Sequence, residues 1–430
     1  MRVPTGDDAV VADHSSGDRG YHSRDSVACE LEENPRPRRR TTTAPSAKRA
    51  LDGTPASGLR VALVHEWLET FSGSERVLEQ LLHCFDSADV FTVVDFMNED
   101  DRRFLQGRPV RTTFIQRLPF ARRYFRHYLG LMPLAIQQLD LSGYDLVISS
   151  NHAVAKGVLT GPDQIHISYI HSPMRYAWDL QHQYLRHANI GRGLRGIYAR
   201  WLLKRLREWD VSSAHHVDHF IANSNYIARR IAKSYRRNST VIYPPVDVDR
   251  FVMRQEKDDF FLLAGRLVPY KQAEVVIESF ADNPARRLIV VGDGPESGRA
   301  RAAARNLPNI EFKGTVPSPV LVDLMQRARA LISAAEEDFG ITMVEAQACG
   351  TPVIAYGRGG ATDIVIPAEQ DEPTGLFFYR QDAAAISEAV DRFEKLEPTF
   401  SSQACRRNAL RFSERRFRAQ IMNFVENAMR

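Results

Sequence analysis

The feature that most constrains this fold is a series of short, continuous apolar runs separated by stretches long enough for helices. The first run is LRVALVHEW, from Leu59, and the series continues with DVFTVVDF, YDLVISS, IHISYIH and HFIANS. Uninterrupted apolar residues are typical of strands buried on both faces of a parallel sheet, and their alternation with helices is typical of an open α/β sheet. The sequence therefore predicts a Rossmann-like domain over residues 58–245.

A second series of the same kind begins at DFFLLAGRL and continues with RRLIVVGDG, IEFKG, ALISAA, TPVIAYG and GLFFY. Between the two series, the paired prolines of YPPVD cannot continue a helix or a central strand, so they indicate a linker. We expect a second Rossmann-like domain over residues 246–400. In the last segment, 401–430, apolar side chains recur at helical spacing, which predicts an amphipathic helix packed on a core: Phe417, Ile421, Phe424 and Val425.

Residues 1–57 differ from the rest of the chain. They are rich in Ser, Thr, Pro, Asp and Arg, and they hold few apolar residues that could offset the entropy cost of ordering. We therefore expect a disordered tail, whose basic cluster at 36–40 fits either a solvated segment or contact with acidic lipid or RNA. Over the whole chain the formal net charge is only +4, so composition gives no reason to expect a nucleic-acid partner.

Cysteine spacing and hydropathy bear on the compartment. The four cysteines are far apart and form no CxxC or Cys/His spacing, so they predict neither a zinc site nor a disulfide framework. No run of about 18 apolar residues is present to span a bilayer, and the first residues lack the apolar core of a signal peptide. We expect a cytoplasmic protein, with peripheral attachment to the inner face of the cell membrane left open.

The loop after the predicted strand ALISAA carries the most specific pattern, EDFGITMVE. Gly340 precedes a helix that we expect to end at Gly350. Free backbone N–H groups at the start of that helix can receive a phosphate or sugar oxygens, and glycine permits close approach. Glu345 lies about one turn inside and can accept two hydrogen bonds from a diol, while Glu337 can reach another hydroxyl. Alternatively, these acids merely stabilise the helix dipole.

This pattern, Glu337-x7-Glu345 around Phe339 and Gly340, resembles the hallmark of the retaining GT-B glycosyltransferases of family 4, also called group 1. Further matches span about 61–378. Arg266 and Lys271, after a predicted strand, resemble the family's pair of diphosphate-binding cations, and two cations can neutralise a departing diphosphate. His171 in YIHSPMRYAWD resembles the histidine that meets the donor sugar in the mannosyltransferase-like branch.

Several glycines extend the resemblance. Gly265 belongs to the loop of the two cations, and Gly292 and Gly294 resemble a turn at the nucleotide pocket. In GSER, Gly73 is the single glycine left of the usual pair near the diphosphate, and Asp363 stands where the family has a glutamate. The resemblance implies a substrate site that includes these backbone positions: Gly73, Gly265, Gly292, Gly294, Phe339, Gly340 and Ile341.

The family implies a GT-B fold, α/β, with two Rossmann-like domains facing a central cleft and a C-terminal helix, 401–430, returning to the first domain. It implies a hexosyltransferase that moves mannose from GDP-mannose to a glycan or lipid-linked acceptor, with the nucleotide-sugar as substrate and no cofactor. No DxD-like metal site is present, so we expect no metal. Glu337 would orient the sugar, Glu345 the ribose and His171 the hexose.

Two basic stretches interleaved with aromatic residues bear on the acceptor. The first lies between Arg111 and Gly130 and the second between Arg186 and Arg207. Basic residues near an anionic leaflet contribute about 1 kcal/mol each, so these stretches fit a membrane surface that carries a lipid-linked acceptor. They fit equally well amphipathic core helices with a solvated face.

Other functions remain open from the sequence. A transferase of glucose or N-acetylglucosamine from a UDP-sugar, a sugar-nucleotide epimerase on the same scaffold, and a non-catalytic nucleotide-sugar binding protein share these motifs. A dinucleotide-dependent oxidoreductase fits less well, because no GxGxxG follows VALVHEW or FFLLAG and the spacing in GDGPESG is one residue too long.

Overall fold

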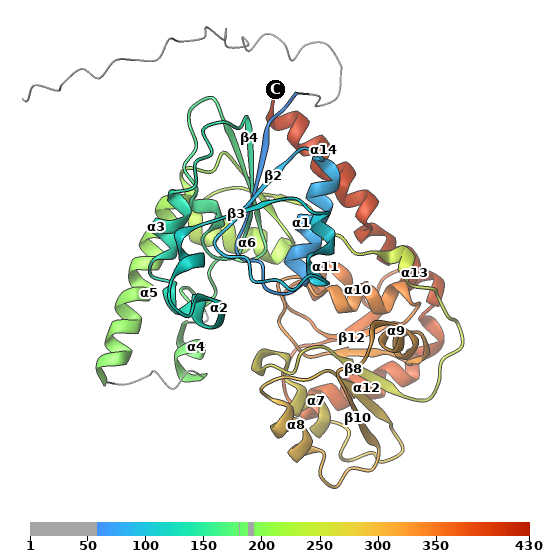
Figure 1. The fold of residues 1–430 in the computed structure, drawn as a ribbon. Helices are drawn as coiled ribbons and strands as arrows, with labels where there is room; N and C mark the ends of the chain where they lie inside the picture. Colours follow the sequence, from blue (N-terminus) through green and yellow to red (C-terminus); the bar gives the residue numbers. More distant parts are fainter. Residues whose placement is uncertain (1–57, 180, 188–192) are drawn as a thin grey trace, which may run out of the picture. The chain divides into compact units, whose positions relative to one another are not determined.

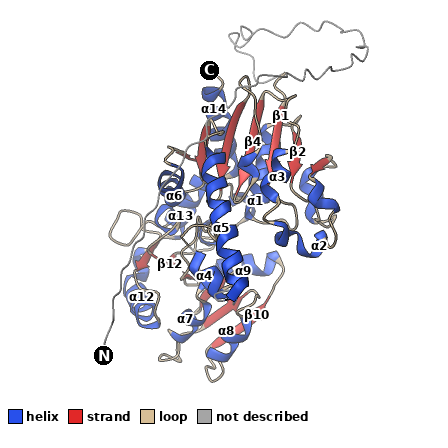
Figure 2. Cartoon of the chain, turned by 90° about the vertical axis from the view of Figure 1, so that its left-hand side faces the viewer, coloured by secondary structure: helices blue, strands red, loops and turns tan. Residues whose placement is uncertain are grey.

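The computed structural model describes residues 58–179, 181–187 and 193–430, and the predicted tail at 1–57 lies outside this range. The described chain contains two parallel sheets, each flanked by helices (Figures 1 and 2). This confirms the predicted fold class of two Rossmann-like domains.

The first sheet has seven strands in the order β3-β2-β1-β4-β5-β6-β7. All neighbours pair in parallel, so every carboxyl end lies at one edge of the sheet. The strands are β1 (Val61–His65), β2 (Asp89–Thr92), β3 (Val110–Thr112), β4 (Leu146–Asn151), β5 (Ile165–Ile170), β6 (His219–Ala222) and β7 (Thr240–Val241).

Side chains of β1 alternate between two apolar layers. Val61 and Leu63 pack with helices α1 (Gly73–Cys84) and α14 (Glu414–Ala428), whereas Ala62 and Val64 pack with α3 (Met132–Gln137) and α5 (Gly193–Ala214). Burial on both faces explains why the strand reads as an uninterrupted apolar run. The remaining helices of this half are α2 (Ala121–Tyr124), α4 (Gln181–His187) and α6 (Asn225–Tyr235).

The second sheet has six strands in the order β10-β9-β8-β11-β12-β13, again parallel. They are β8 (Phe261–Ala264), β9 (Leu288–Val291), β10 (Ile310–Gly314), β11 (Leu331–Ser333), β12 (Val353–Tyr356) and β13 (Gly375–Phe378). The helices are α7 (Ala273–Glu278), α8 (Ser297–Ala303), α9 (Ser318–Arg327), α10 (Ile341–Ala348), α11 (Ala361–Ile364), α12 (Ala383–Leu396) and α13 (Ser402–Ala409).

The C-terminal segment crosses between the two halves. Helix α13 packs on α10, where the Asn408 amide donates to Gln347 at 2.6 Å. Helix α14 then runs beside α1 (Figure 1) and buries three apolar side chains against the first sheet: Phe417, Ile421 and Val425. The segment expected to be one helix is therefore two, with only α14 returning to the first domain.

Within the described residues, no helix combines the length and the apolar character needed to cross a bilayer.

Candidate active site

The loop from β11 into α10 is shaped by one glycine. Gly340 is the N-cap of α10 with φ of +107°, a left-handed conformation that side chains with a Cβ rarely adopt. A Cβ at this position would lie 2.1 Å from the Met343 Cε atom. Glycine therefore lets the chain turn tightly into α10, and the first N–H groups of a helix have no partner within the helix.

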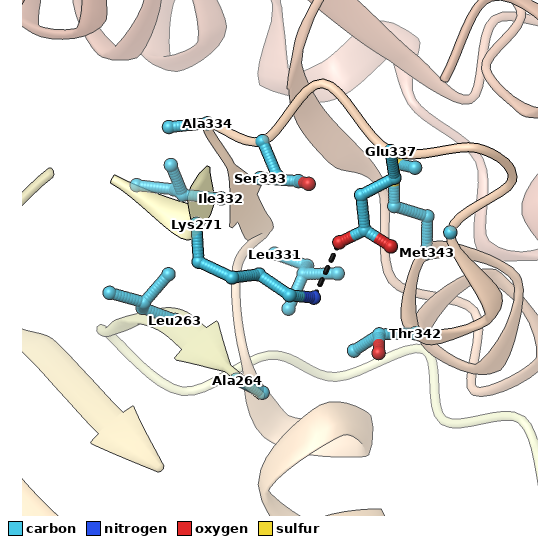
Figure 3. A pocket seen from close by; sticks show the side chains of 12 residues that line it. Leu263, Ala264, Lys271, Leu331, Ile332, Ser333, Ala334, Glu337, Thr342 and Met343 are labelled. Atoms are coloured by element: carbon cyan, nitrogen blue, oxygen red, sulfur yellow. Dashed lines mark hydrogen bonds and ion pairs between the residues drawn. The ribbon is translucent and has the colours of Figure 1, made fainter. Parts of the chain in front are cut away.

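Glu337 and Lys271 form an ion pair in front of this turn (Figure 3). Lys271 ends a 3-10 turn, Pro269–Lys271, in the loop after β8, and each side chain is 17% exposed. Burial alone would lower the pKa of Lys271, but the adjacent Glu337 charge outweighs it and the net effect raises the pKa. The pair therefore places the Lys271 ammonium against the Glu337 carboxyl group at the end of the second sheet.

The loops after β8 and β9 pack backbone against backbone. A Cβ on Gly292 would lie 2.0 Å from the Gly265 carbonyl oxygen, and one on Gly294 would lie 2.3 Å from the Leu267 carbonyl oxygen. These glycines thus bring the two loops into contact. Arg266 projects from them, is exposed, and has no ion-pair partner among the described side chains.

Glu345 faces the first sheet's half of the molecule. Its Oε1 atom accepts a hydrogen bond from Arg76 Nη1 at 2.9 Å, and Arg76 lies in the first turn of α1. At the same junction a Cβ on Gly73 would lie 3.1 Å from Ile341 Cδ1. The starts of α1 and α10 therefore meet, which brings Gly73 and Ile341 together from opposite domains.

Asp338 makes a second contact between the two halves. Its carboxylate pairs with Arg175 and, at 3.3 Å, with Arg230, and its backbone carbonyl accepts from the Ser224 hydroxyl at 2.6 Å. The sequence indicated Arg175 only as part of the His171 motif and gave no role to Asp338 or Arg230, because their partners lie more than 100 positions away. The charge of Asp338 beside the two glutamates was the only signal available.

His171 lies directly after β5, at the carboxyl edge of the first sheet. Its Nε2 atom lies 2.8 Å from Ser150 Oγ, and its ring contacts Tyr169. Burial, with smaller contributions from His152 and His65, lowers the pKa of His171 to about 3. The imidazole is therefore neutral near pH 7 and serves as a hydrogen-bonding group rather than as a cation.

A cleft of about 530 Å³ lies where these loops converge. Its walls include Gly73, His171, Arg175, Glu337, Gly340 and Ile341. Lys271 lies behind Glu337 and lines a much smaller hollow, of about 10 Å³, which Glu337 and Gly340 share with the cleft (Figure 3). Phe339 also borders the cleft, but its side chain is buried against Tyr243 and Phe412, so only its backbone can meet a ligand.

The structure thus brings many predicted site residues to one place. Glu337, Gly340, Ile341, Gly73 and His171 border the cleft. Lys271 adjoins it through Glu337, whereas Glu345 does not line the cleft and pairs with Arg76. Gly265, Gly292 and Gly294 lie in the loops behind Lys271. Among the residues that the structure describes, no group of three or more His, Cys, Asp or Glu side chains is placed to hold a metal ion.

Two parallel sheets with a ligand-sized cleft at their carboxyl ends define the GT-B architecture, and comparisons with known proteins identify the glycosyltransferases as its class here. The model described as Glycosyltransferase Family 4 matches residues 71–250, and the model described as Glycosyl transferases group 1 matches residues 247–412. The chain belongs to this glycosyltransferase family.

Relatives with assigned names match part of the chain. The D-inositol 3-phosphate glycosyltransferase of Geodermatophilus obscurus is 32% identical over 232 residues, which is 46% of this chain and 49% of that protein. The GDP-mannose-dependent monoacylated alpha-(1-6)-phosphatidylinositol monomannoside mannosyltransferase of Corynebacterium glutamicum is 30% identical over 39% of this chain and 50% of that protein. The chain therefore matches about half the length of these relatives.

Solved structures share the fold over a larger range. Sucrose-phosphate synthase from Thermosynechococcus elongatus superposes with a TM-score of 0.65 at 18% identity, covering 86% of this chain and 98% of that one. Anabaena HepE in complex with UDP and glucose superposes with a TM-score of 0.63 at 17% identity, covering 85% and 99%. At these identities the likeness establishes the fold.

Proposed function

We propose that the protein is a retaining, metal-independent hexosyltransferase that moves mannose from GDP-mannose to a hydroxyl of a glycan or lipid-linked glycan. The observation that carries the proposal is the Lys271–Glu337 pair in front of the Gly340 turn, beside a cleft between two sheets. A nucleotide-sugar needs cations and N–H donors for its diphosphate and a carboxylate for its sugar hydroxyls. The Corynebacterium relative is a GDP-mannose-dependent phosphatidylinositol monomannoside mannosyltransferase, which supports mannose and a lipid-linked acceptor.

Each side chain has a distinct role in this proposal. Lys271 and the exposed Arg266 neutralise the charge that develops on the departing diphosphate, which is the work that a metal ion does elsewhere. Glu337 accepts hydrogen bonds from the hexose, and Glu345 accepts them from the ribose diol after exchanging its contact with Arg76. His171 meets the hexose from the first domain.

The chemical step breaks the bond between the anomeric carbon and the phosphate oxygen and forms a bond from that carbon to the acceptor oxygen on the same face. The acceptor proton passes to the departing phosphate oxygen. Because the pKa of His171 is lowered to about 3, this side chain is a poor base near pH 7, which supports the phosphate as proton acceptor.

A thermal-shift panel tests the donor. GDP-mannose, UDP-glucose, UDP-N-acetylglucosamine and NAD are compared, since a ligand at 100 times its dissociation constant stabilises by about 2.7 kcal/mol. We expect stabilisation by GDP-mannose. Stabilisation by a UDP-sugar alone would change the assigned donor but leave the assignment as a glycosyltransferase. Stabilisation by NAD alone overturns the proposal.

Product analysis separates transfer from the other functions. Glu337→Gln removes the sugar-facing charge, and Glu336→Gln, one position earlier and facing Tyr226, is the matched control. We expect E337Q to lower kcat/KM by about 100-fold and E336Q to change it little. Release of free sugar and nucleotide without an acceptor indicates an epimerase, and binding without turnover indicates a binding protein. An inverted anomeric product contradicts retention.

An exposed apolar and basic face on the first domain supports peripheral attachment to the inner face of the cell membrane. Phe120 is 79% exposed and Leu194, in the first turn of α5, is 85% exposed. The two segments adjoin, because a Cβ on Gly130 would lie 3.2 Å from Leu202 Cδ1 in α5. Further exposed side chains of the face are Arg117, Arg122, Arg123, Tyr124, Leu131, Leu134, Arg195, Ile197, Tyr198, Trp201, Lys204 and Arg205.

Liposome flotation tests this part of the proposal. Apolar side chains can enter the acyl boundary while the surrounding cations meet anionic headgroups. We expect binding to vesicles with anionic lipid, weaker binding to neutral vesicles, and weakened binding of Phe120→Ser and Trp201→Ser. Val252→Ser, which removes a 69% exposed apolar side chain from the second half, is the control. Failure to float with either vesicle contradicts the attachment.

A further inference from the structure

A buried chain of hydrogen bonds leads from a carboxylate in α1 to the imidazole at the cleft. Glu75 Oε1 lies 3.1 Å from His65 Nε2, His65 Nδ1 lies 3.1 Å from Ser150 Oγ, and Ser150 Oγ lies 2.8 Å from His171 Nε2. The first three residues are 4% or less exposed. The proposed function uses only the last residue of the chain, His171.

The topology of the first sheet places these residues together. His65 is the last residue of β1 and stands directly opposite Ser150 in the parallel register of β4. His171 follows β5, which pairs with β4 on its other side, and its N–H donates to the Asn151 carbonyl at 2.9 Å. Glu75 comes from the first turn of α1, which begins after β1. All four side chains therefore gather at the carboxyl edge of the sheet.

Glu75 fixes the direction of the first hydrogen bond. Burial raises its pKa, but the hydrogen bonds from His65 and Ser72 outweigh burial and lower the pKa to about 2. Its other oxygen accepts from the Ser72 N–H at 3.0 Å and from the Ser74 hydroxyl at 3.0 Å. An ionised carboxylate only accepts hydrogen bonds, so His65 Nε2 must carry a proton.

The direction then propagates along the chain. When the His65 imidazole is neutral, its Nδ1 atom carries a lone pair that accepts a hydrogen bond from the Ser150 hydroxyl. The Ser150 oxygen in turn accepts a hydrogen bond from His171 Nε2. His171 then has no proton on Nδ1. That atom has no hydrogen-bond partner among the described residues, and His171 borders the cleft.

We propose that Glu75, His65 and Ser150 are positioning residues: they hold His171 in the tautomer with its proton on Nε2 and present the Nδ1 lone pair to a hydroxyl of the bound sugar. The inference rests on the proposed function for its sugar but not for its tautomer. A fixed tautomer makes His171 Nδ1 a defined hydrogen-bond acceptor in the cleft. Ligand binding then does not have to supply the free energy of selecting one tautomer.

The first test determines the tautomer of His171 from nitrogen-15 NMR spectra and does not depend on activity. The 13 histidines of the chain are labelled with nitrogen-15, and His171 is assigned by its loss in His171→Gln. We expect an unprotonated Nδ1 in the wild type and in Ser149→Ala, and a mixture of tautomers in Ser150→Ala. Ser149 is the matched control because it is the adjacent buried serine of β4 and bonds another histidine, His166, at 2.9 Å.

The second test reads kinetics. Ser150→Ala is expected to lower kcat/KM by about ten-fold, the value of one hydrogen bond of about 1.4 kcal/mol, while Ser149→Ala stays near the wild type.

Two results overturn the inference: an unchanged His171 tautomer in Ser150→Ala, or equal kcat/KM values for Ser150→Ala and Ser149→Ala. Absence of transfer with every nucleotide-sugar overturns the proposed function instead, and the nitrogen-15 spectra then still decide the tautomer.

Discussion

Arg76 Nη1 lies 2.9 Å from Glu345 Oε1, and this contact joins the first turn of α1 to α10 in the other domain. Arg76 is 31% exposed at its side chain and Glu345 12%, so water reaches the pair from one side. Glu345 is the residue proposed to hold the ribose. A donor must therefore exchange this ion pair for hydrogen bonds to its own hydroxyls, and Arg76 is then free to face the diphosphate.

Glu345→Gln is expected to weaken donor binding by about ten-fold, because hydrogen bonds to a charged acceptor are stronger than those to an amide. Isothermal titration with the nucleotide-sugar measures it. The control is Glu311→Gln, which removes an exposed pair with Lys313 on the edge strand β10. Equal dissociation constants for the two variants contradict the role of Glu345.

Lys271→Ala and Arg266→Ala are expected to separate activity from stability. Both remove a cation from the diphosphate and should lower kcat/KM by about 100-fold or more. Only Lys271→Ala leaves a largely buried carboxylate, Glu337, without its partner, so only this variant should also lower Tm. Steady-state kinetics and calorimetry of both proteins check this, and a Lys271→Ala enzyme with wild-type kcat/KM rules the assignment out.

Gly340→Ala is expected to lower the free energy of unfolding by about 1–3 kcal/mol, because φ of +107° is unfavourable for alanine and the new methyl would meet Met343. Gly298→Ala is the control, since a Cβ there meets nothing within 4 Å and the residue lies in helix α8. We expect the control to stabilise slightly, by about 0.5–1 kcal/mol. Urea denaturation measures the free energy of unfolding of both variants. An unchanged free energy in Gly340→Ala would show that alanine is not strained at this position.

Acid stability should depend on Glu75. Its pKa falls from 4.5 to about 2 on folding, so the folded state favours the ionised form and gains stability from it above pH 4.5. That contribution, about 3 kcal/mol from a shift of this size, is lost as the pH falls from 4.5 toward 2. Glu75→Gln should be less stable near pH 6 and show a flatter decline on acidification. The measurement is the free energy of unfolding of the wild type and of Glu75→Gln at several pH values. If this free energy falls equally steeply with pH in both proteins, Glu75 does not make this contribution.

The sequence predicted the long, buried strands well. Each apolar run named from the sequence contains a strand, from VALVH in β1 to GLFF in β13, because most of these strands are covered on both faces and are therefore largely apolar. The short edge strands β3 and β7 were missed. They have three and two residues and are only partly buried, so no apolar run marks them.

The sequence by itself determined the two Rossmann-like domains, the turn at Gly340, and the charged side chains of Glu337, Glu345 and Lys271 near it. These are local properties, because hydrophobic periodicity, helix starts and glycine positions depend on residues that are close together in the sequence. Only the tertiary structure decided how the charges pair. Glu345 meets Arg76 and Asp338 meets Arg175 and Arg230 across the domains, while His65 reaches His171 through Ser150. Strand register and helix docking set these distances, and neither can be inferred from a single sequence.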